Sequence, residues 1–540
     1  MNAVAVTIYR SPYGLLYIVY NMTEVAALIK KKKVVLTFFA VLLLLLGGLY
    51  ARKSYQKDQV FSNADFLSTS EKIYGLSVIW ETAKTYYGMW DLVPDLDWDA
   101  EYQDAISRVL ETDNLYAYYN ELSAFVALLR DGHSQLGCVD EDYLSVLRNG
   151  NGFWISPFAL QHMEGAFVLR SAARSILDQI PLGSTIIEIN GLPTEEYLEQ
   201  EYGRYVGWHT YGRREEMLAE MMLLSEEAKE LTVAGFTPDR TEFRVSLSYS
   251  EQYGSERKQL TDGDFSKELK TDETTYDSFS SYTVEDRIYV AKLPDFGNNA
   301  LQEEFAQWIE DTREYASAYI LDARGNAGGS DGNALAVLQH FIAFEDIAEF
   351  SVYKQYLDPR QVNMGLSMEY FADSIVSGSE LEQYFLDGQA MYEHRYYVPV
   401  DSGTPIPYES AHESDGTNVE PPPVALCAQP VVILTDWNCV SAGEDFIAYA
   451  KYAKNRDNIT IIGTNTAGGT GQILVEELPG KIFFGVSTYN CVLPDGTPIC
   501  NNGVQPDIWC EQTVADAHAR RDTVLLEAID HLKGKTTEHD

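Results

Sequence analysis

The sequence predicts an α/β protein with a helical segment before its core and a β domain inserted between the two. Three observations predict this fold class. Residues 431–435 form an apolar, β-branched run typical of a buried strand, and they lead through a polar turn into a helical pattern after Ser441. A second strand–helix–strand pattern surrounds a glycine-rich turn at residues 322–329, which indicates a βαβ unit. Between residues 150 and 253, short strand-like runs separated by turns replace the helical spacing.

Composition excludes several classes of protein. A chain of 540 residues is long enough for two or three domains and a large core. It carries 81 acidic against 40 basic residues, a formal charge of −41, so we expect no nucleic-acid partner, because nucleic acids bind to basic grooves. A hydrophobic content of 45% excludes a disordered chain. The composition predicts a folded, acidic protein.

The N-terminal region contains a candidate membrane anchor. Lys30–Lys33 precede the uncharged run Val34–Ala51, which is just long enough to span a bilayer. A cleaved signal peptide and a buried helix are the alternatives, but the end of the run is a poor cleavage site and leucine lies on all its faces. The pattern predicts a cytoplasmic segment at residues 1–33, unstructured before Met22, and a transmembrane signal anchor at residues 34–51. The rest of the chain would then be extracytoplasmic at the cell membrane.

A polar stalk at residues 52–65 leads into a helical segment at residues 66–149. Apolar residues at three- and four-residue spacings predict helices over Ser68–Lys84, Trp98–Leu110 and Leu115–Leu129. The third helix stops at Asp131-Gly132-His133-Ser134, a polar loop. From the residues alone, His133 can be a surface charge after a helix or a catalytic base.

The inserted β domain is expected at residues 150–253. Strand-like runs occur at Phe153–Leu160, Ala166–Ser171, Thr185–Ile189 and Phe243–Tyr249. A helix, a turn and a strand that ends in Asn190-Gly191 resemble a PDZ-like domain, a class that binds chain ends as an added strand. An ordinary β domain that serves as a spacer is the alternative.

The α/β core is expected at residues 254–515, with a Tyr-rich insertion at 345–423 and a C-terminal helix at 516–540. Its first βαβ unit places strands 288–293 and 318–322 around helix 300–315, and a helix at 332–341 follows the glycine-rich turn. These glycines do not fit G-x-G-x-x-G and no Gly-Lys-Ser/Thr follows, so a nucleotide site is weakly supported. A glycine-rich turn can equally direct backbone N–H groups at an oxyanion.

Ser441 lies where a buried strand is followed by a helix. The carboxyl ends of strands in open α/β sheets are where ligands bind, and the free N–H groups of a helix start can stabilise an oxyanion. These features make Ser441 a candidate nucleophile. The alternative is structural: Ser441 and Glu444 have the spacing of a capping box, and Glu444 and Asp445 suit the helix dipole without catalysis.

Neither a metal nor a cofactor is expected. None of the six cysteines forms a C-x-x-C pair and there is no H-E-x-x-H motif. Cys491 and Cys500 flank Leu-Pro-Asp-Gly-Thr-Pro, a turn that can place them opposite each other in a hairpin. The pair can form a disulfide outside the cytoplasm, or the cysteines can be small buried side chains.

Five motifs in order resemble the serine peptidase family of tail-specific proteases and tricorn cores. They are Asp131–Ser134, Asp322–Gly329, Ser441–Phe446, Thr466-Ala467-Gly468-Gly469 and Gly503-Val504-Gln505-Pro506-Asp507. The resemblance spans residues 66–510 in the family's order of helical segment, PDZ-like domain and split α/β catalytic core. It implies a serine-type peptidase, acting on unfolded or chain-terminal peptides of a peptide or protein substrate.

The resemblance also implies roles for particular residues. Ser441 matches the nucleophile, and the N–H groups of Gly328 and Ala442 match the oxyanion hole. Tail-specific proteases use a lysine where this chain has Gly469, and Lys451 and Lys454 are poor substitutes, since ten helical residues place Lys451 about 15 Å from Ser441. The tricorn-like branch instead uses a histidine that matches His133, a suitable base near pH 7.

Two departures from the tricorn-like pattern leave the partner of His133 open. Gly132 stands where that branch has a serine, and Cys500-Asn501-Asn502 stands where it has a glutamate. Ser134 is one possible support for the imidazole. The second hypothesis is a catalytically decayed protein of the same fold that binds peptides or apolar ligands. The third is a PDZ scaffold without catalytic activity.

Overall fold

The computed structural model describes residues 6–10, 16–20, 67–138, 154–250, 257–260, 265–343, 346–347, 351–355, 396–397, 406–407, 427–471 and 473–534. The chain divides into two compact units, Met1–Ala64 and Asp65–Asp540. In the first unit, β1 (Val6–Arg10) pairs antiparallel with β2 (Leu16–Tyr20). The prediction that the residues before Met22 are unstructured is therefore wrong.

The second unit begins with three helices, as predicted. They are α3 (Thr69–Tyr86), α4 (Trp98–Glu111) and α5 (Leu115–Ala127). Ser68 caps α3 with a complete capping box through Glu71, and Asp97 and Asn114 cap the next two helices through their side chains. The helices bury a common core with one aromatic pair at its centre, because the rings of Trp98 and Phe125 stack 4.0 Å apart.

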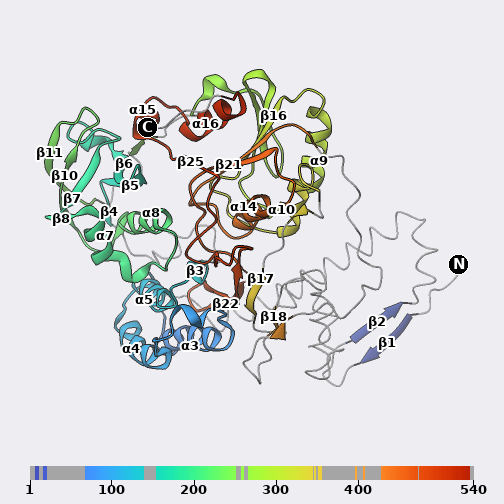
Figure 1. Cartoon of the computed structure of the whole chain (residues 1–540). Helices are drawn as coiled ribbons and strands as arrows, with labels where there is room; N and C mark the ends of the chain where they lie inside the picture. Colours follow the sequence, from blue (N-terminus) through green and yellow to red (C-terminus); the bar gives the residue numbers. More distant parts are fainter. Residues whose placement is uncertain are drawn as a thin grey trace. The chain divides into compact units, whose positions relative to one another are not determined.

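A separate antiparallel sheet follows. Its strands run in the order β11-β10-β7-β6-β12, with β5 paired to β6 and β8 to β7. The bounds are β5 (Phe158–Met163), β6 (Ala166–Ala173), β7 (Thr185–Ile189), β8 (Leu192–Pro193), β10 (Glu230–Phe236), β11 (Glu242–Ser248) and β12 (Arg257–Gln259). Two helices that the sequence did not predict, α7 (Thr194–Tyr202) and α8 (Tyr211–Met221), pack their apolar faces on this sheet (Figure 1).

The core is a second sheet of seven strands in the order β13-β14-β15-β16-β20-β21-β25. Five strands are parallel: β15 (Ile288–Lys292), β16 (Ala318–Asp322), β20 (Val431–Thr435), β21 (Ile459–Gly463) and β25 (Ile508–Trp509). The antiparallel edge is formed by β13 (Thr271–Thr275) and β14 (Ser280–Val284). The mixed α/β fold that the sequence predicts is confirmed.

Helices cover both faces of this sheet. On one face lie α9 (Ala300–Thr312), α10 (Asp331–Leu338) and α14 (Ala442–Tyr452), and on the other lies α16 (Thr523–Leu532), preceded by α15 (Val514–His518). Side chains alternate between the two layers along β20: Val431 and Ile433 join the first core cluster, and Val432 and Leu434 join the second. Burial on both faces explains why the sequence of β20 is an uninterrupted apolar run.

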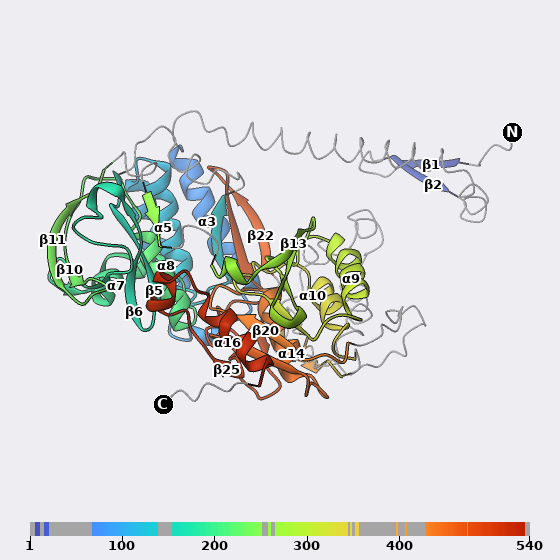
Figure 2. The ribbon, with the colours of Figure 1, turned by 90° about the horizontal axis from the view of Figure 1, so that it is seen from above.

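A three-stranded sheet ties the helical segment to the core. β3 (Gln135–Cys138) pairs antiparallel with β23 (Ile482–Ser487), which pairs with β22 (Ile473–Leu478). β22 lies beside α3, so this hairpin of the core packs into the helical segment (Figure 2). Because β3 begins two residues after His133, the pairing holds the loop of His133 against the core.

Some of the predicted segments lie outside the residues that the structure describes. The transmembrane run 34–51 and most of the insertion 345–423 belong to this group. Among the helices that the structure does describe, none combines the length and apolar character needed to cross a membrane. Short strands at Ser351–Gln355, Tyr396–Tyr397 and Ile406–Pro407 are the described parts of the insertion that have regular structure.

The predicted hairpin with its two cysteines forms, but the disulfide does not. β24 (Tyr489–Val492) turns back so that the N–H of Ile499 donates to the carbonyl of Cys491 at 2.9 Å. None of the six cysteines forms a disulfide. The thiol of Cys500 lies 3.7 Å from Oδ1 of Asp131, so it points to the helical segment and not across the hairpin.

Candidate active site

Ser441 occupies a strained turn between β20 and α14. Its φ of 55° and ψ of −130° lie in a region that residues with a side chain rarely adopt. A Cβ added to Gly328 would lie 2.6 Å from Cβ and 3.1 Å from Oγ of Ser441, so the glycine-rich turn after β16 packs directly on this serine. The strand end, the strain and the glycine contact together present the Ser441 hydroxyl at the carboxyl edge of the sheet.

The capping-box interpretation of this serine is wrong. The side chain of Ser441 makes no capping hydrogen bond. Glu444 is fully buried, and the N–H of Ser441 donates to Gly469 and not to this carboxylate. The carboxylate accepts hydrogen bonds from Thr466 Oγ1, from Gly468 N at 2.9 Å and from Gly469 N at 2.6 Å. Burial raises the pKa of Glu444 to about 7, and these three donors oppose that rise. Glu444 therefore supports the loop 466–469.

The two predicted oxyanion donors differ in whether their N–H group is already hydrogen-bonded. The N–H of Gly328 donates to Oδ1 of Asn326 at 2.9 Å, so it would have to exchange this partner to bind an oxyanion. Ala442 is the first residue of α14, where N–H groups lack partners within the helix. The positive end of the helix dipole adds to the attraction for an anion at this point.

His133 lies in a turn that Asp131 organises. The buried carboxylate of Asp131 accepts hydrogen bonds from the N–H of His133 at 2.9 Å and from the N–H of Ser134 at 3.0 Å. His133 is itself only 8% exposed. Burial lowers its pKa, against an opposing contribution from Asp131, so the imidazole is neutral near pH 7 and can accept a proton.

Gly469 joins the loops of Ser441 and His133. Its carbonyl accepts a hydrogen bond from the N–H of Ser441 at 2.9 Å. A Cβ added to Gly469 would lie 3.5 Å from N and 3.6 Å from Cβ of His133. A lysine side chain at this position would therefore extend toward the backbone of His133.

The two lysines of the neighbouring helix segment lie elsewhere. The Nζ of Lys451 donates to the carbonyl of Gln505 at 2.8 Å and lies 3.6 Å from Asp507. The backbone N–H of Lys454 donates to Asp346. The Nζ of Lys451 is thus bound to the segment 505–507 and not to Ser441.

The hydroxyl of Ser134 supports the turn and not the imidazole. It donates to Oδ2 of Asp131 at 2.5 Å and accepts a hydrogen bond from the N–H of Ser487 at 3.0 Å. Ser134 thus ties Asp131 to the end of β23.

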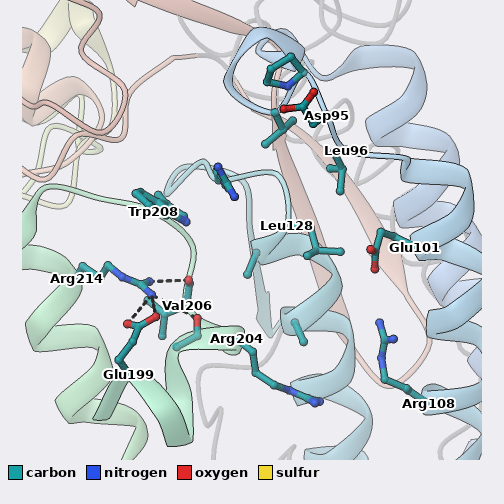
Figure 3. A pocket seen from close by; sticks show the side chains of 16 residues that line it. Asp95, Leu96, Glu101, Arg108, Leu128, Glu199, Arg204, Val206, Trp208 and Arg214 are labelled. Carbon is teal, nitrogen blue, oxygen red and sulfur yellow. Dashed lines mark hydrogen bonds and ion pairs between the residues drawn. The ribbon is translucent and has the colours of Figure 1, made fainter. Parts of the chain in front are cut away.

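His209 fills the space that Gly132 leaves open. A Cβ added to Gly132 would lie 2.1–2.5 Å from three atoms of the His209 ring. The segment before this ring is held by Arg214, which donates to the carbonyls of Val206 at 2.9 Å and Gly207 at 3.2 Å and pairs with Glu199 at 2.8 Å. Figure 3 shows the contacts of Arg214 with Val206 and Glu199 at the edge of a pocket of about 600 Å³, which Trp208 also lines.

A second cavity, of about 570 Å³, lies beside His133. Gly132 and Ser134, the residues on either side of His133, both line it, together with His209. Most of its remaining wall is apolar, and α5, β3 and α8 contribute much of it. The apolar lining residues include Val126, Leu136, Ile155, Val206, Met217 and Leu223. The cavity offers room for an apolar side chain next to the candidate base.

The two loops that the structure brings together were predicted from the sequence, but the residues that support them were not. Glu444 was interpreted as part of a cap, although its partners lie more than twenty residues further along the chain. Asp131 was named within a motif without a role. His209 carried no signal, because nothing in the sequence shows that it packs on Gly132.

Part of the chain matches a known family of proteins. Residues 287–510 match the model of "Peptidase family S41". No curated protein matches the chain. Among solved structures, the chain is similar to mature CPAF, with 17% identity and a TM-score of 0.61 over 87% of this chain and 99% of that one.

Two further structures extend the comparison. CPAF complexed with lactacystin gives 17% identity and a TM-score of 0.59 over 86% of this chain and 98% of that one. The photosystem II D1 C-terminal processing protease is 14% identical over 81% of this chain and 93% of that one, and its TM-score of 0.36 is too low to support an argument. The similarity to CPAF shows a shared fold that extends well beyond the matched core.

The family resemblance predicted from the motifs is thus confirmed. The match includes the glycine-rich turn, Ser441, the 466–469 loop and the exit at residues 503–507. Residues 287–510 are similar to peptidase family S41, and this match indicates that the chain is a serine-type peptidase.

Proposed function

We propose that this peptidase is a membrane-anchored endopeptidase in which Ser441 is the nucleophile and His133 is the general base. One observation carries the pairing: the carbonyl of Gly469 accepts the N–H of Ser441, and a Cβ added to Gly469 would lie 3.5 Å from the backbone N of His133. Neutral His133 takes the proton of the Ser441 hydroxyl as the oxygen attacks the peptide carbonyl, and it then gives this proton to the leaving amine.

The oxyanion of the tetrahedral intermediate is proposed to lie at the start of α14. The N–H of Ala442 is the first donor, and the N–H of Gly328 is the second once it leaves Asn326 Oδ1. The close approach of Gly328 to Ser441 supports this assignment, because it places the residue that carries the second N–H group directly beside the nucleophile.

The proposed substrates are unfolded or chain-terminal peptides. The apolar cavity beside His133 supports an apolar substrate side chain near the cleaved bond. The β domain between the helical segment and the core supports capture of a peptide as an added strand, if it acts as a PDZ-like domain. Anchoring in the cell membrane, with the peptidase outside the cytoplasm, rests on Lys30–Lys33 and the apolar run that follows.

Kinetics of three variants test the choice of base. His133→Ala should lower kcat for a peptide substrate by several powers of ten, because the Ser441 hydroxyl loses its proton acceptor. Lys451→Ala and Lys454→Ala should stay within about threefold of the wild type. An active His133→Ala enzyme together with an inactive lysine variant would assign the base to a lysine.

A binding protein with a decayed site is the second candidate, and one observation favours it. Nδ1 of His133 is buried and makes no hydrogen bond to any described residue, so the base lacks a visible third partner. Reaction with a serine-directed fluorophosphonate separates the two functions, because only an activated Ser441 would be labelled.

A further inference from the structure

The imidazole of His133 needs a partner on one specific side. A histidine that accepts the serine proton through Nε2 must carry its own proton on Nδ1, and a buried Nδ1–H requires an acceptor. Nδ1 of His133 is buried without a hydrogen bond in the described part of the chain. Asp131, the nearest carboxylate on its own loop, already receives the N–H groups of His133 and Ser134 and the hydroxyl of Ser134.

His209 presents an unpaired nitrogen in the same region. Its Nδ1 is also buried without a hydrogen bond among the described residues. The carbonyl of Ala467 is hydrogen-bonded to this imidazole and raises its pKa, although burial and the neighbouring cations lower the pKa overall to about 3. Since a carbonyl only accepts and Nδ1 has no partner, Nε2 must carry the proton. Nδ1 of His209 is therefore an acceptor that lacks a donor.

The His209 ring packs on the turn that contains His133. Ring atoms of His209 pack against Gly132, the residue before His133, closely enough to exclude any larger side chain there. A positive charge on His133 also contributes to the lowered pKa of His209, as expected of two imidazoles in the same part of the molecule. Arg214 holds the Val206–Gly207 segment that leads into His209, and a Cβ on Gly207 would lie 3.0 Å from the carbonyl oxygen of Asp131.

We propose that His209 is the positioning residue of the active site, whose Nδ1 accepts the Nδ1–H of His133 and so directs Nε2 of His133 toward Ser441. The chain would then use a serine–histidine–histidine arrangement. This inference rests on the proposed function, because it assumes that His133 is the base. It gives the two unpaired ring nitrogens complementary roles, one as donor and the other as acceptor.

Asn501 is the rival acceptor. Its Oδ1 is buried without a partner among the described residues, and its Nδ2 donates to the carbonyl of Arg130 at 2.8 Å. The Asn501 amide thus contacts the beginning of the turn, whereas the His209 ring lies on the residue next to His133. This difference favours His209.

Three substitutions of His209 in the full chain separate positioning from packing. His209→Asn keeps an acceptor at the place of Nδ1, His209→Gln keeps a donor at the place of Nε2 for Ala467, and His209→Phe keeps the ring volume with neither. We expect kcat to fall about 100-fold or more in His209→Gln and His209→Phe with KM within threefold, and His209→Asn to stay within tenfold of the wild type. Asn501→Ala should stay within threefold.

A spectroscopic readout tests the same contact without activity. In Ser441→Ala protein labelled with ¹⁵N-histidine, the Nδ1–H proton of His133 should give a downfield resonance that His209→Asn retains and His209→Phe removes. A folded His209→Phe enzyme within tenfold of wild-type kcat would overturn the inference, as would loss of both activity and resonance in Asn501→Ala alone. An active His133→Ala enzyme would instead refute the base assignment on which the inference rests.

Discussion

Ser441 is a residue whose backbone is held in an unfavourable conformation at the point where the chemistry is expected. Its φ of 55° is tolerated because neighbouring groups fix it: the N–H of Ser441 donates to Gly469, and the N–H groups of Glu444 and Asp445 donate to its carbonyl. This backbone strain does not itself stabilise the folded protein. It exposes the hydroxyl between the glycine-rich turn and the 466–469 loop.

Replacing Ser441 by glycine should therefore make the protein more stable while it removes activity. Glycine adopts positive φ without a steric cost, so relief of strain of about 1–3 kcal/mol should exceed the entropic cost of the added backbone freedom of about 1 kcal/mol. Ser441→Ala serves as the control: it keeps the strain and, because Ser441 makes no capping bond, it should change the free energy of unfolding little. Urea unfolding measures both, and a less stable Ser441→Gly would contradict the interpretation of the strain.

Activity should rise with pH as His133 loses its proton. Burial lowers the pKa of His133 below the ordinary value of 6.5, so the neutral, active form should persist to a pH below 6.5. The pH dependence of kcat/KM should show its acidic midpoint below 6.5. A midpoint well above 8, as expected of a lysine base, would contradict this account.

The two central residues were predictable because they stand at ends of regular elements. Ser441 follows a buried strand and His133 follows a helix stop, and both patterns are visible in the sequence. The partners of these residues were not predictable, since Glu444, Asp131 and His209 act through contacts between distant parts of the chain.

Two contacts between secondary-structure elements bring the loops of these residues together. β3 joins the helical segment to β23 of the core, and the 466–469 loop follows β21 and lies against α14. Two strands of the parallel core, β16 and β20, were predicted with their exact bounds, because both are buried on both faces and their sequences are continuous apolar runs. Helices α7 and α8 were missed, because their charged and tyrosine-rich sequences have weak apolar periodicity.

Glu444 should prove essential to the loop that α14 supports. In Glu444→Gln an amide group replaces one of two oxygens that accept three hydrogen bonds, so at least one buried donor of Thr466, Gly468 or Gly469 loses its partner. We expect a loss of about 1–3 kcal/mol in the free energy of unfolding and a lower kcat. Glu303→Gln, an exposed position on α9, is the matched control and should be neutral. Equal behaviour of the two variants would refute this role.

At the scale of the whole molecule, the helical segment and the core each contribute one loop to the candidate site. The cavity beside His133 lies among α5, β3 and α8, so it depends on the β domain as well. No single segment of the sequence contains this cavity, which explains why it could not be predicted from local patterns.

Removal of the first 60 residues should separate anchoring from folding. The unit Asp65–Asp540 is compact by itself, so a chain that starts at Phe61 should be soluble and as active as the full chain. The full chain should instead sediment with membranes, owing to the apolar run 34–51. Sedimentation of cell extracts followed by peptidase assay measures both. Full-length protein in the soluble fraction would refute the anchor.

The central claim is that Ser441 is an activated nucleophile, and covalent labelling tests it most directly. The wild-type chain is treated with a fluorophosphonate, and the labelled peptide is identified by mass spectrometry. We predict a single adduct on Ser441, its absence in Ser441→Ala, and labelling slowed by about 100-fold or more in His133→Ala. A folded wild-type protein that stays unlabelled, or labelling that persists in Ser441→Ala, would contradict the account.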